Sequence, residues 1–428
     1  MIKLLWHKEN RNFQRLWWGQ IISQFGDRIH QFALVGLIAE RPDSSAMNLA
    51  KLLAFTILPV FIIQPFAGTF VDRWNRQTTL FVCDLFRGLL VLTIPFCFIY
   101  WHSMVPIYGI VFLIFCFSRF YVPAKMSIIP DLVKADNLLM ANSLVSTTGM
   151  IAFVLGCAAG GFLVNAYGAR NGFIIDAGTF FISGAFVFTI AIPRHLTVNK
   201  ERLLQSSHEI VDTIKTSIWE DMAEGFKYLI QHREIRFIIN ILFILLSAAG
   251  SVYVVIIVFI QKTFKSVTAD LAIMAIFLGA GLFVGAIGYG KWGKKFKWYN
   301  TMFGCLILGG IMLLFFTVLA HFYANLYLTM FLAFIMGIVI GPIFIAANTV
   351  VHVVSDEKMR GKVFSALEIV IHFAFLVAMF VSSWLSEFIE EYWILSAVSV
   401  IFILVGLVGL LRAKKNGLKF AFSPDHVA

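Results

Sequence analysis

The stretch Gly68-Thr69-Phe70-Val71-Asp72-Arg73-Trp74-Asn75-Arg76-Gln77 joins two long apolar runs, Leu52–Val71 before it and Thr78–Tyr100 after it. Each run is long enough for a helix that crosses a bilayer, which takes ~20 residues. Few polar residues separate the runs, so the second helix must turn back at once. Arginine next to a span marks the cytoplasmic side. The stretch therefore predicts a hairpin with a cytoplasmic turn, although spacing alone fits a merely charged turn equally well.

The composition excludes an ordinary soluble protein. Of the 428 residues, 60% are hydrophobic and 14% are charged, whereas soluble domains carry roughly 25% charged residues. Apolar runs of spanning length predict an all-α membrane protein with twelve transmembrane helices in two six-helix halves. The predicted spans are Phe13–Ala39, Leu49–Val71, Thr78–Tyr100, Val105–Pro123, Leu138–Tyr167, Gly172–Ile192, Ile235–Ile260, Leu271–Tyr289, Tyr299–Ala320, Leu326–Val354, Val363–Leu385 and Trp393–Leu411.

The basic residues orient these spans. If both termini are cytoplasmic, most of the 34 Lys and Arg residues lie on the cytoplasmic side, which is the positive-inside pattern. The net charge of +10 then matches the anionic lipids of the inner leaflet, so no nucleic-acid partner is implied. The absence of any N-x-S/T sequon favours a bacterial inner membrane. We therefore expect a multi-pass inner-membrane protein with cytoplasmic termini.

The two halves repeat a pattern. Arg73-Trp74-Asn75-Arg76-Gln77 corresponds to Lys291-Trp292-Gly293-Lys294-Lys295, and Pro123 in span 4 corresponds to Pro342 in span 10. Between the halves lies a charged linker with apolar residues at helical spacing, which predicts either an amphipathic surface helix or a connector packed on the bundle. The predicted domains are an N-terminal half at 1–192, the linker at 193–233, a C-terminal half at 234–412 and a cytoplasmic tail at 413–428.

Three charges fall inside the third and fourth spans. Asp84 and Arg87 are three residues apart and share one helix face, and Arg119 lies at similar depth. Charges in hydrocarbon must pair or line a wet cavity, because an isolated one costs several kcal/mol. We predict that these residues form one buried charge cluster. It is either a static ion pair or one in which Asp84 takes up a proton and releases an arginine.

A second group of polar residues is predicted to line a cavity for substrate and protons. Asp27, Arg28 and His30 lie near the middle of span 1, and Glu368 and His372 lie four residues apart in span 11. Histidine titrates near neutral pH, which suits proton exchange. A metal site is the alternative, but no second carboxylate accompanies the E-x-x-x-H pattern, so no metal is expected.

Small residues in two spans predict close helix packing. Gly156 and Gly160 give span 5 a flat face, and Gly281 and Gly285 offer a partner face in span 8.

No pattern in the sequence points to catalysis. Gly285-x4-Gly290-Lys291 fits most of a phosphate-binding loop, but Trp292 stands where a serine or threonine should ligate Mg²⁺. No nucleotide site, enzymatic activity or cofactor is therefore expected, and any pumping must use an ion gradient.

Several motifs resemble one known family. The pattern G-x-x-x-D-R-x-N-R at Gly68–Arg76 is similar to the loop signature between helices 2 and 3 of the major facilitator superfamily. Span 5 resembles its antiporter signature G-x-x-x-G-P-x-x-G-G, with Ala152 and Cys157 replacing the first glycine and the proline. The stretches that resemble its macrolide-efflux-type proton antiporters are Gln20–Asp27, Asp84–Arg87, Pro123-Ala124, Ile129–Val133, Ala141–Leu144 and Ile175–Phe180.

The resemblance implies a monomeric secondary transporter that exports a hydrophobic or amphipathic small molecule in exchange for protons, by alternating access. A lipid or lysophospholipid flippase is the alternative, and a non-transporting sensor or scaffold is a third possibility. The expected partners are a small-molecule or lipid substrate, protons and membrane lipids.

The resemblance also implies a cytoplasmic gate, because it brings spans 2 and 11 together there. Asp72, Arg73 and Arg76 end span 2, and Arg360 and Lys362 begin span 11. The first backbone N–H groups of a helix carry the positive end of its dipole. The Asp72 carboxylate is therefore expected to latch the halves on the cytoplasmic side.

Overall fold

The computed structural model describes residues 10–41, 45–101, 103–134, 137–191, 227, 231, 233–293, 298–354 and 360–415. Within these ranges the chain is helical and contains no strand. Among the described residues nine helices are long and apolar enough to cross a membrane. One of them, Met140–Phe188, is broken at Gly168, where φ is +81°. The prediction of an all-α membrane protein is confirmed, and the count of twelve spans stays a prediction.

Contacts divide the chain into two compact units. The N-terminal unit comprises Met1–Pro42 and Lys51–Glu220, and the C-terminal unit comprises Asp43–Ala50 and Asp221–Ala428. The predicted linker at 193–233 and its amphipathic helix lie almost wholly outside the described residues, as does the tail after Lys415. The division into two halves, a linker and a tail therefore stays a prediction.

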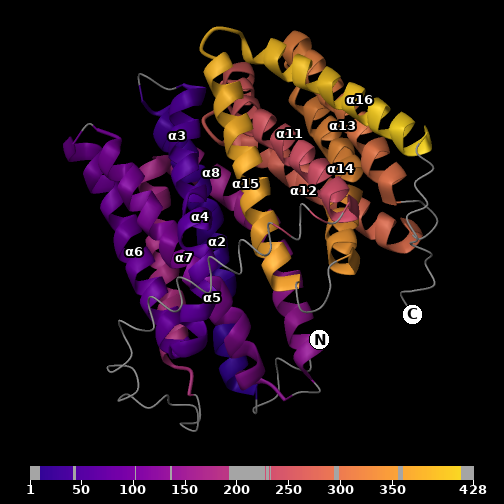
Figure 1. Cartoon of the computed structure of the whole chain (residues 1–428). Helices are drawn as coiled ribbons and strands as arrows, with labels where there is room; N and C mark the ends of the chain where they lie inside the picture. The colour runs from indigo at the N-terminus through magenta and orange to yellow at the C-terminus, as the bar shows by residue number, and fades with distance from the viewer. Residues whose placement is uncertain are drawn as a thin grey trace. The chain divides into compact units, whose positions relative to one another are not determined.

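Four long helices form the frame of the N-terminal unit. Helix α2 packs along α8, and α6 packs against both α7 and α8 (Figure 1). Their bounds are α2 (Arg11–Ala39), α6 (Arg76–Trp101), α7 (Val105–Leu132) and α8 (Leu138–Phe188). The buried core between them includes Phe13, Leu16, Leu80 and Ile128.

The second predicted span keeps helical backbone angles at Leu58 and Ile63, but its hydrogen-bond ladder is interrupted at both residues. It consists of α3 (Ala46–Ile57), α4 (Pro59–Ile62) and α5 (Gln64–Arg73). Each break falls just before a proline-containing turn, and Pro59 and Pro65 occupy the first turn of the next piece. Proline has no backbone N–H and its ring clashes with the preceding turn, so it suits the start of a helix better than its interior.

The charged stretch ties the start of α6 to the end of α8. The Thr78 backbone N–H donates to Asn75 Oδ1 at 3.0 Å, so Asn75 caps α6. Gln77 Nε2 donates to the backbone oxygens of Val187 at 3.0 Å and Ile190 at 2.7 Å. These bonds add side-chain donors at the end of α8, where a helix leaves backbone carbonyl groups without helical partners. The start of α6 and the end of α8 are therefore held together by side chains from the turn.

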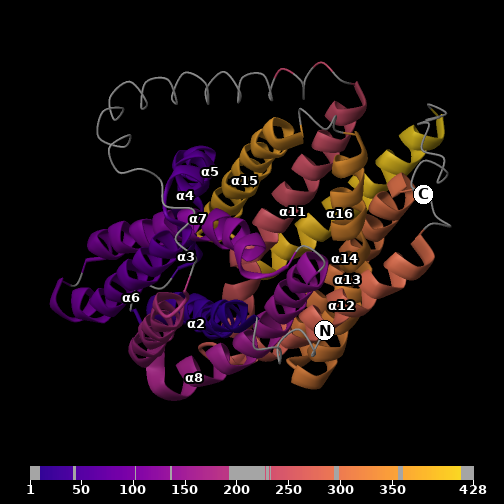
Figure 2. The same cartoon turned by 90° about the horizontal axis from the view of Figure 1, so that it is seen from below.

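Six of the described helices, all after Asp221, form three close pairs in the C-terminal unit. In Figures 1 and 2, α11 lies beside α15, α12 beside α14, and α13 beside α16. Their bounds are α11 (Arg233–Phe264), α12 (Ala269–Trp292), α13 (Trp298–Tyr323), α14 (Leu326–Val354), α15 (Arg360–Leu385) and α16 (Glu391–Lys415).

The same pairing occurs in both units. In the N-terminal unit α2 packs on the first part of α8, α5 on α7, and α6 on the last part of α8. The corresponding pairs in the C-terminal unit are α11 with α15, α12 with α14 and α13 with α16. A shared set of partners is what a parallel internal repeat produces.

The predicted glycine faces pack within their own units. A Cβ atom at Gly156 would lie 2.8 Å from Arg28 Cγ, and one at Gly160 would lie 3.0 Å from Ile29 Cα, both on α2. Gly281 and Gly285 instead meet the α14 backbone. The expectation that these two glycine pairs face each other is therefore wrong. A flat face accepts any close neighbour, so spacing could not select the partner.

Replacing Gly281 with alanine tests the packing of α12 on α14. The added Cβ would overlap the Phe334 carbonyl oxygen, and overpacking of this kind costs about 1–3 kcal/mol. Gly281→Ala should lower the unfolding temperature of the purified protein by several degrees, about what such a free-energy loss produces. Gly304→Ala is the matched control, because nothing lies within 4 Å of its Cβ position. Equal unfolding temperatures for the two variants would contradict the packing.

Candidate functional site

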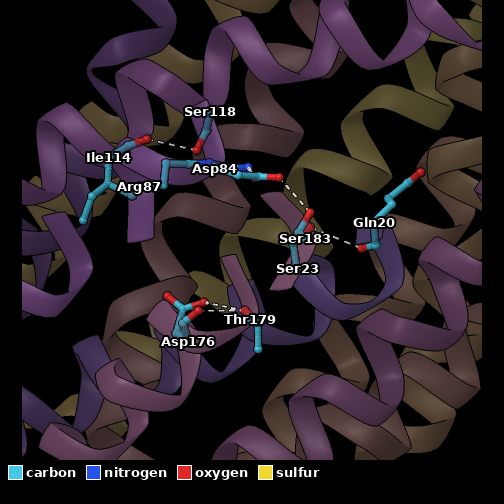
Figure 3. A network of polar contacts seen from close by, with 9 residues as sticks. All are labelled: Gln20, Ser23, Asp84, Arg87, Ile114, Ser118, Asp176, Thr179 and Ser183. Atoms are coloured by element: carbon cyan, nitrogen blue, oxygen red, sulfur yellow. Dashed lines mark hydrogen bonds and ion pairs between the residues drawn. The ribbon is translucent and has the colours of Figure 1, made fainter. Parts of the chain in front are cut away.

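The centre of the N-terminal unit is a buried ion pair on α6. Asp84 is fully enclosed and its Oδ1 accepts a hydrogen bond from Arg87, one turn later in the same helix. Ser183 of α8 donates to Asp84 Oδ2 at 2.7 Å (Figure 3). Both carboxylate oxygens therefore have partners, as a charge buried in a membrane protein requires.

Aromatic rings enclose the other half of the pair. The Arg87 guanidinium carbon lies 4.3 Å from the ring centroids of Tyr121 on α7 and Phe180 on α8. A guanidinium over an aromatic face is attracted by the ring quadrupole, and more strongly where water is excluded. The ion pair therefore connects α6 to both α7 and α8.

Arg119 does not belong to this pair, which corrects the prediction of a three-residue cluster. Its guanidinium donates to Gln64 Oε1 of α5 at 3.3 Å. Successive residues of a helix are rotated by about 100°, so Arg119 points about 200° away from Tyr121. Because Tyr121 faces Arg87, Arg119 faces a different neighbour. The sequence placed Arg119 within a span but could not give the direction in which its side chain points.

His30 also lies elsewhere than predicted. Its Nδ1 lies 2.9 Å from Oδ2 of Asp176 on α8, and both side chains are almost fully buried. Phe115 and Phe173 contact the imidazole ring. His30 is therefore enclosed within the N-terminal unit and does not line an open cavity. It follows Gly26 by one turn, on the side of α2 that packs against Asp176.

Asp176 was missed as a site residue, although it is an ionisable residue within the apolar run Gly172–Ile192 and could have been suspected on that ground. Ser183 gave no comparable signal, because serine is common in transmembrane helices.

Arg28 lies on the surface of α2 that faces the first part of α8. Its guanidinium donates to Gln31 Oε1 at 2.8 Å and lies 4.7 Å from the Phe153 ring centroid. Its aliphatic portion fits against Gly156. The charge is thus partnered on its own helix and by an aromatic ring.

Asp27 and Lys125 differ from these closed contacts. Both are half-buried, and among the described residues neither forms a hydrogen bond or an ion pair. Asp27 lies within electrostatic range of Lys125 and of Arg87. Lys125 was missed because span 4 was expected to end at Pro123, whereas α7 continues to Leu132 with that proline inside it. A lysine that seemed cytoplasmic is therefore part of the helix.

Glu368 and His372 form a contact within α15. His372 Nδ1 lies 2.8 Å from the Glu368 backbone oxygen and 3.6 Å from its Oε2, and both side chains are half-exposed. No group of three or more metal-ligating side chains occurs in the described part of the chain. Their predicted role in proton exchange stays a prediction.

The predicted gate is described only in part. Arg76 donates to Asp131 Oδ2 at 2.6 Å and to the Ser127 backbone oxygen at 3.0 Å, so it joins α6 to the end of α7. The side chains of the other four gate residues lie outside what the structure describes, namely Asp72, Arg73, Arg360 and Lys362.

Neutralising Asp84 tests the buried pair. Asp84→Asn leaves the Arg87 charge buried without its partner, which typically costs 3–5 kcal/mol. We expect a large loss of folded protein, measured as the monodisperse fraction in size-exclusion chromatography. The double variant Asp84→Asn/Arg87→Met removes both charges and should recover much of that loss. An Asp84→Asn protein as stable as the wild type would contradict the ion pair.

The sequence matches the Major Facilitator Superfamily over residues 16–318 and again over 240–425. It is 26% identical over 411 residues to the uncharacterized MFS-type transporter YfiS of Bacillus subtilis, covering 92% of this chain and 91% of the relative. Macrolide efflux protein A of Streptococcus pyogenes is 22% identical over 427 residues, covering 95% and 98% of the two chains. The putative bacilysin exporter BacE of B. subtilis is 22% identical over 367 residues, covering 83% and 84%.

Solved structures show the same fold. A POT family transporter in complex with a thioalcohol-conjugated peptide superposes with a TM-score of 0.70 at 12% identity, covering 95% of this chain and 96% of the other. The nucleoside transporter NupG superposes with a TM-score of 0.67 at 12% identity, covering 93% and 99%. The all-helical fold and the family match over most of the chain lead to one conclusion: this protein is a multi-pass membrane transporter that belongs to the Major Facilitator Superfamily.

Proposed function

We propose that the protein is a proton-coupled exporter of a hydrophobic or amphipathic small molecule, acting by alternating access in a bacterial inner membrane. The observation that carries the proposal is the similarity to macrolide efflux protein A, which extends over 95% of this chain and 98% of that protein. The similarity to a putative bacilysin exporter points in the same direction.

Asp27 is the residue to which we assign the coupled proton. A carboxylate inside a membrane-spanning helix costs several kcal/mol when charged and much less when protonated. Asp84 and Asp176 already have close partners in the unit, whereas Asp27 is half-buried and keeps its carboxylate free of such contacts among the described residues. A group in that position can exchange a proton without breaking a buried ion pair. Glu368 and His372 are the corresponding candidates in the C-terminal unit.

Reconstitution in liposomes with an imposed pH gradient tests the proposal. A macrolide such as erythromycin should move against its own concentration gradient toward the acidic side of the membrane. Its addition should also cause a measurable flow of protons in the opposite direction. Asp27→Asn should abolish the proton flow, because an amide cannot exchange a proton at neutral pH. Asp270→Asn is the control, since Asp270 lies in the first turn of α12. A rate of macrolide export that is the same with and without the pH gradient would contradict proton coupling.

We further propose that Asp72 latches the cytoplasmic side against the start of α15. The carboxylate would meet the positive end of the helix dipole, an interaction worth ~0.3–1 kcal/mol, and the Arg360 and Lys362 charges would add to it. This is enough to shift a balanced two-state equilibrium severalfold but too little to unfold the protein.

Cysteine labelling measures the latch. Asp72→Asn in the otherwise native protein should fold normally and transport more slowly. In a separate background without native cysteines, where Asp27→Cys serves only as the labelling site, Asp72→Asn should raise the labelling of that cysteine by a cytoplasmic thiol reagent. Asp131→Asn, which removes the partner of Arg76 within the N-terminal unit, serves as a comparison at the same membrane surface. Slower transport with unchanged labelling would show that Asp72 acts in another way.

A further inference from the structure

In the described part of the N-terminal unit, nearly every charged side chain inside a long helix has a partner within the unit. Asp84 binds Arg87 and Ser183, His30 lies against Asp176, Arg28 binds Gln31, and Arg119 binds Gln64. In the same unit Asp27 and Lys125 stand apart, because neither has a hydrogen-bond or ion-pair partner among the residues that the structure describes. An unneutralised charge in a membrane helix is costly, and such residues mark substrate or ion paths.

Lys125 is placed by the helix that carries it. It follows Tyr121 by four residues, so the two side chains lie on one face of α7. Tyr121 covers the Arg87 guanidinium, which fixes that face toward the interior of the unit. Lys125 lies about 10 Å from the C-terminal end of α7, at 1.5 Å per residue. Its charge is therefore held within the unit, on the side of the buried ion pair.

Asp27 is placed by the packing of α2 on α8. A Cβ at the preceding residue, Gly26, would lie 2.6 Å from Asp176 Oδ1, so this turn of α2 is pressed against α8. Asp27 follows Gly26 in the helix and is half-buried. The cations within its electrostatic range are Lys125 and Arg87. Arg87 already binds Asp84, so of these two cations Lys125 is the one without a hydrogen-bonded partner among the described residues.

We propose that Asp27 and Lys125 form a two-point site for a zwitterionic substrate. The protonated amine of the substrate binds the Asp27 carboxylate, and its carboxylate or phosphate group binds the Lys125 ammonium. A singly charged ligand is attracted by one of the two charges and repelled by the other, whereas a zwitterion is attracted by both. This inference rests on the proposed transport function and names the class of substrate that the site selects.

Two matched ligand series test the charge pattern with the purified full-length protein. The soluble series is the dipeptide Ala-Phe, its N-acetyl derivative, which is only anionic, and its C-terminal amide, which is only cationic. The lipid series is lysophosphatidylethanolamine and its N-acetylated derivative. Apparent dissociation constants come from ligand-dependent thermal shifts in detergent. The series that responds tells whether the zwitterion is a soluble compound or a lipid headgroup.

The wild-type protein should bind the zwitterion of one series about tenfold or more tightly than its singly charged relatives, as expected for one added charged contact. Lys125→Gln and Asp27→Asn should each remove that preference. The exchange Asp27→Lys/Lys125→Asp should restore it, because a zwitterion can bind in the reverse orientation. Lys51→Gln, at an exposed position of α3, should keep it. The absence of a preference in both series, or a preference that survives Lys125→Gln, would overturn the proposal.

The outcome is separable from that of the proposed function. Macrolide export driven by a pH gradient, together with no preference for zwitterions, would leave the transport function standing and remove this site. A preference for zwitterions that depends on Lys125, without any proton-coupled flux, would establish the site and remove proton-coupled export.

Discussion

The N-terminal unit depends on the side chains that neutralise the Asp84 carboxylate, which is buried where water does not reach. Leaving one member of a buried pair without its partner costs several kcal/mol. Arg87 and Ser183 occupy both oxygens of the carboxylate, and rings from α7 and α8 enclose the guanidinium. The Cβ position of Gly184 lies 3.5 Å from Asp84 Cβ, so α8 is in van der Waals contact with α6 beside the ion pair. One ion pair therefore sets the spacing of three helices.

These contacts also distinguish charged residues with a structural role from those that could take part in transport. In secondary transporters, alternating access is largely a rigid-body movement of one repeat against the other around a fixed site. A unit whose internal charges are satisfied by its own helices can move as a body without exposing them. Under the proposed function, Asp27 and Lys125, which have no such partners among the described residues, are the charges that would meet ligands and protons. The pairing of helices is the same in both units, which fits a repeat built for such movement.

The sequence predicted what hydrophobicity and depth determine. The apolar runs identified the helices, and the three-residue spacing of Asp84 and Arg87 identified their pair. The direction of a side chain around its helix was not available from one sequence, because it depends on the neighbours. Arg119 was therefore assigned to the wrong cluster and His30 to a cavity, and Lys125 was taken as cytoplasmic because Pro123 was read as the end of a span. Proline is tolerated within α7, whereas Pro59 and Pro65 interrupt the second span.

The central claim is that the Asp84 and Asp176 carboxylates are buried against partners within the N-terminal unit, whereas the Asp27 carboxylate is accessible. Carboxyl footprinting measures this directly: the folded protein is treated with a carbodiimide and an amine nucleophile, and the modified aspartates are quantified by peptide mass spectrometry. The account predicts that Asp27 is modified, whereas Asp84 and Asp176 react only after the protein is unfolded. Modification of Asp84 as fast as that of Asp27 in the folded protein would contradict it.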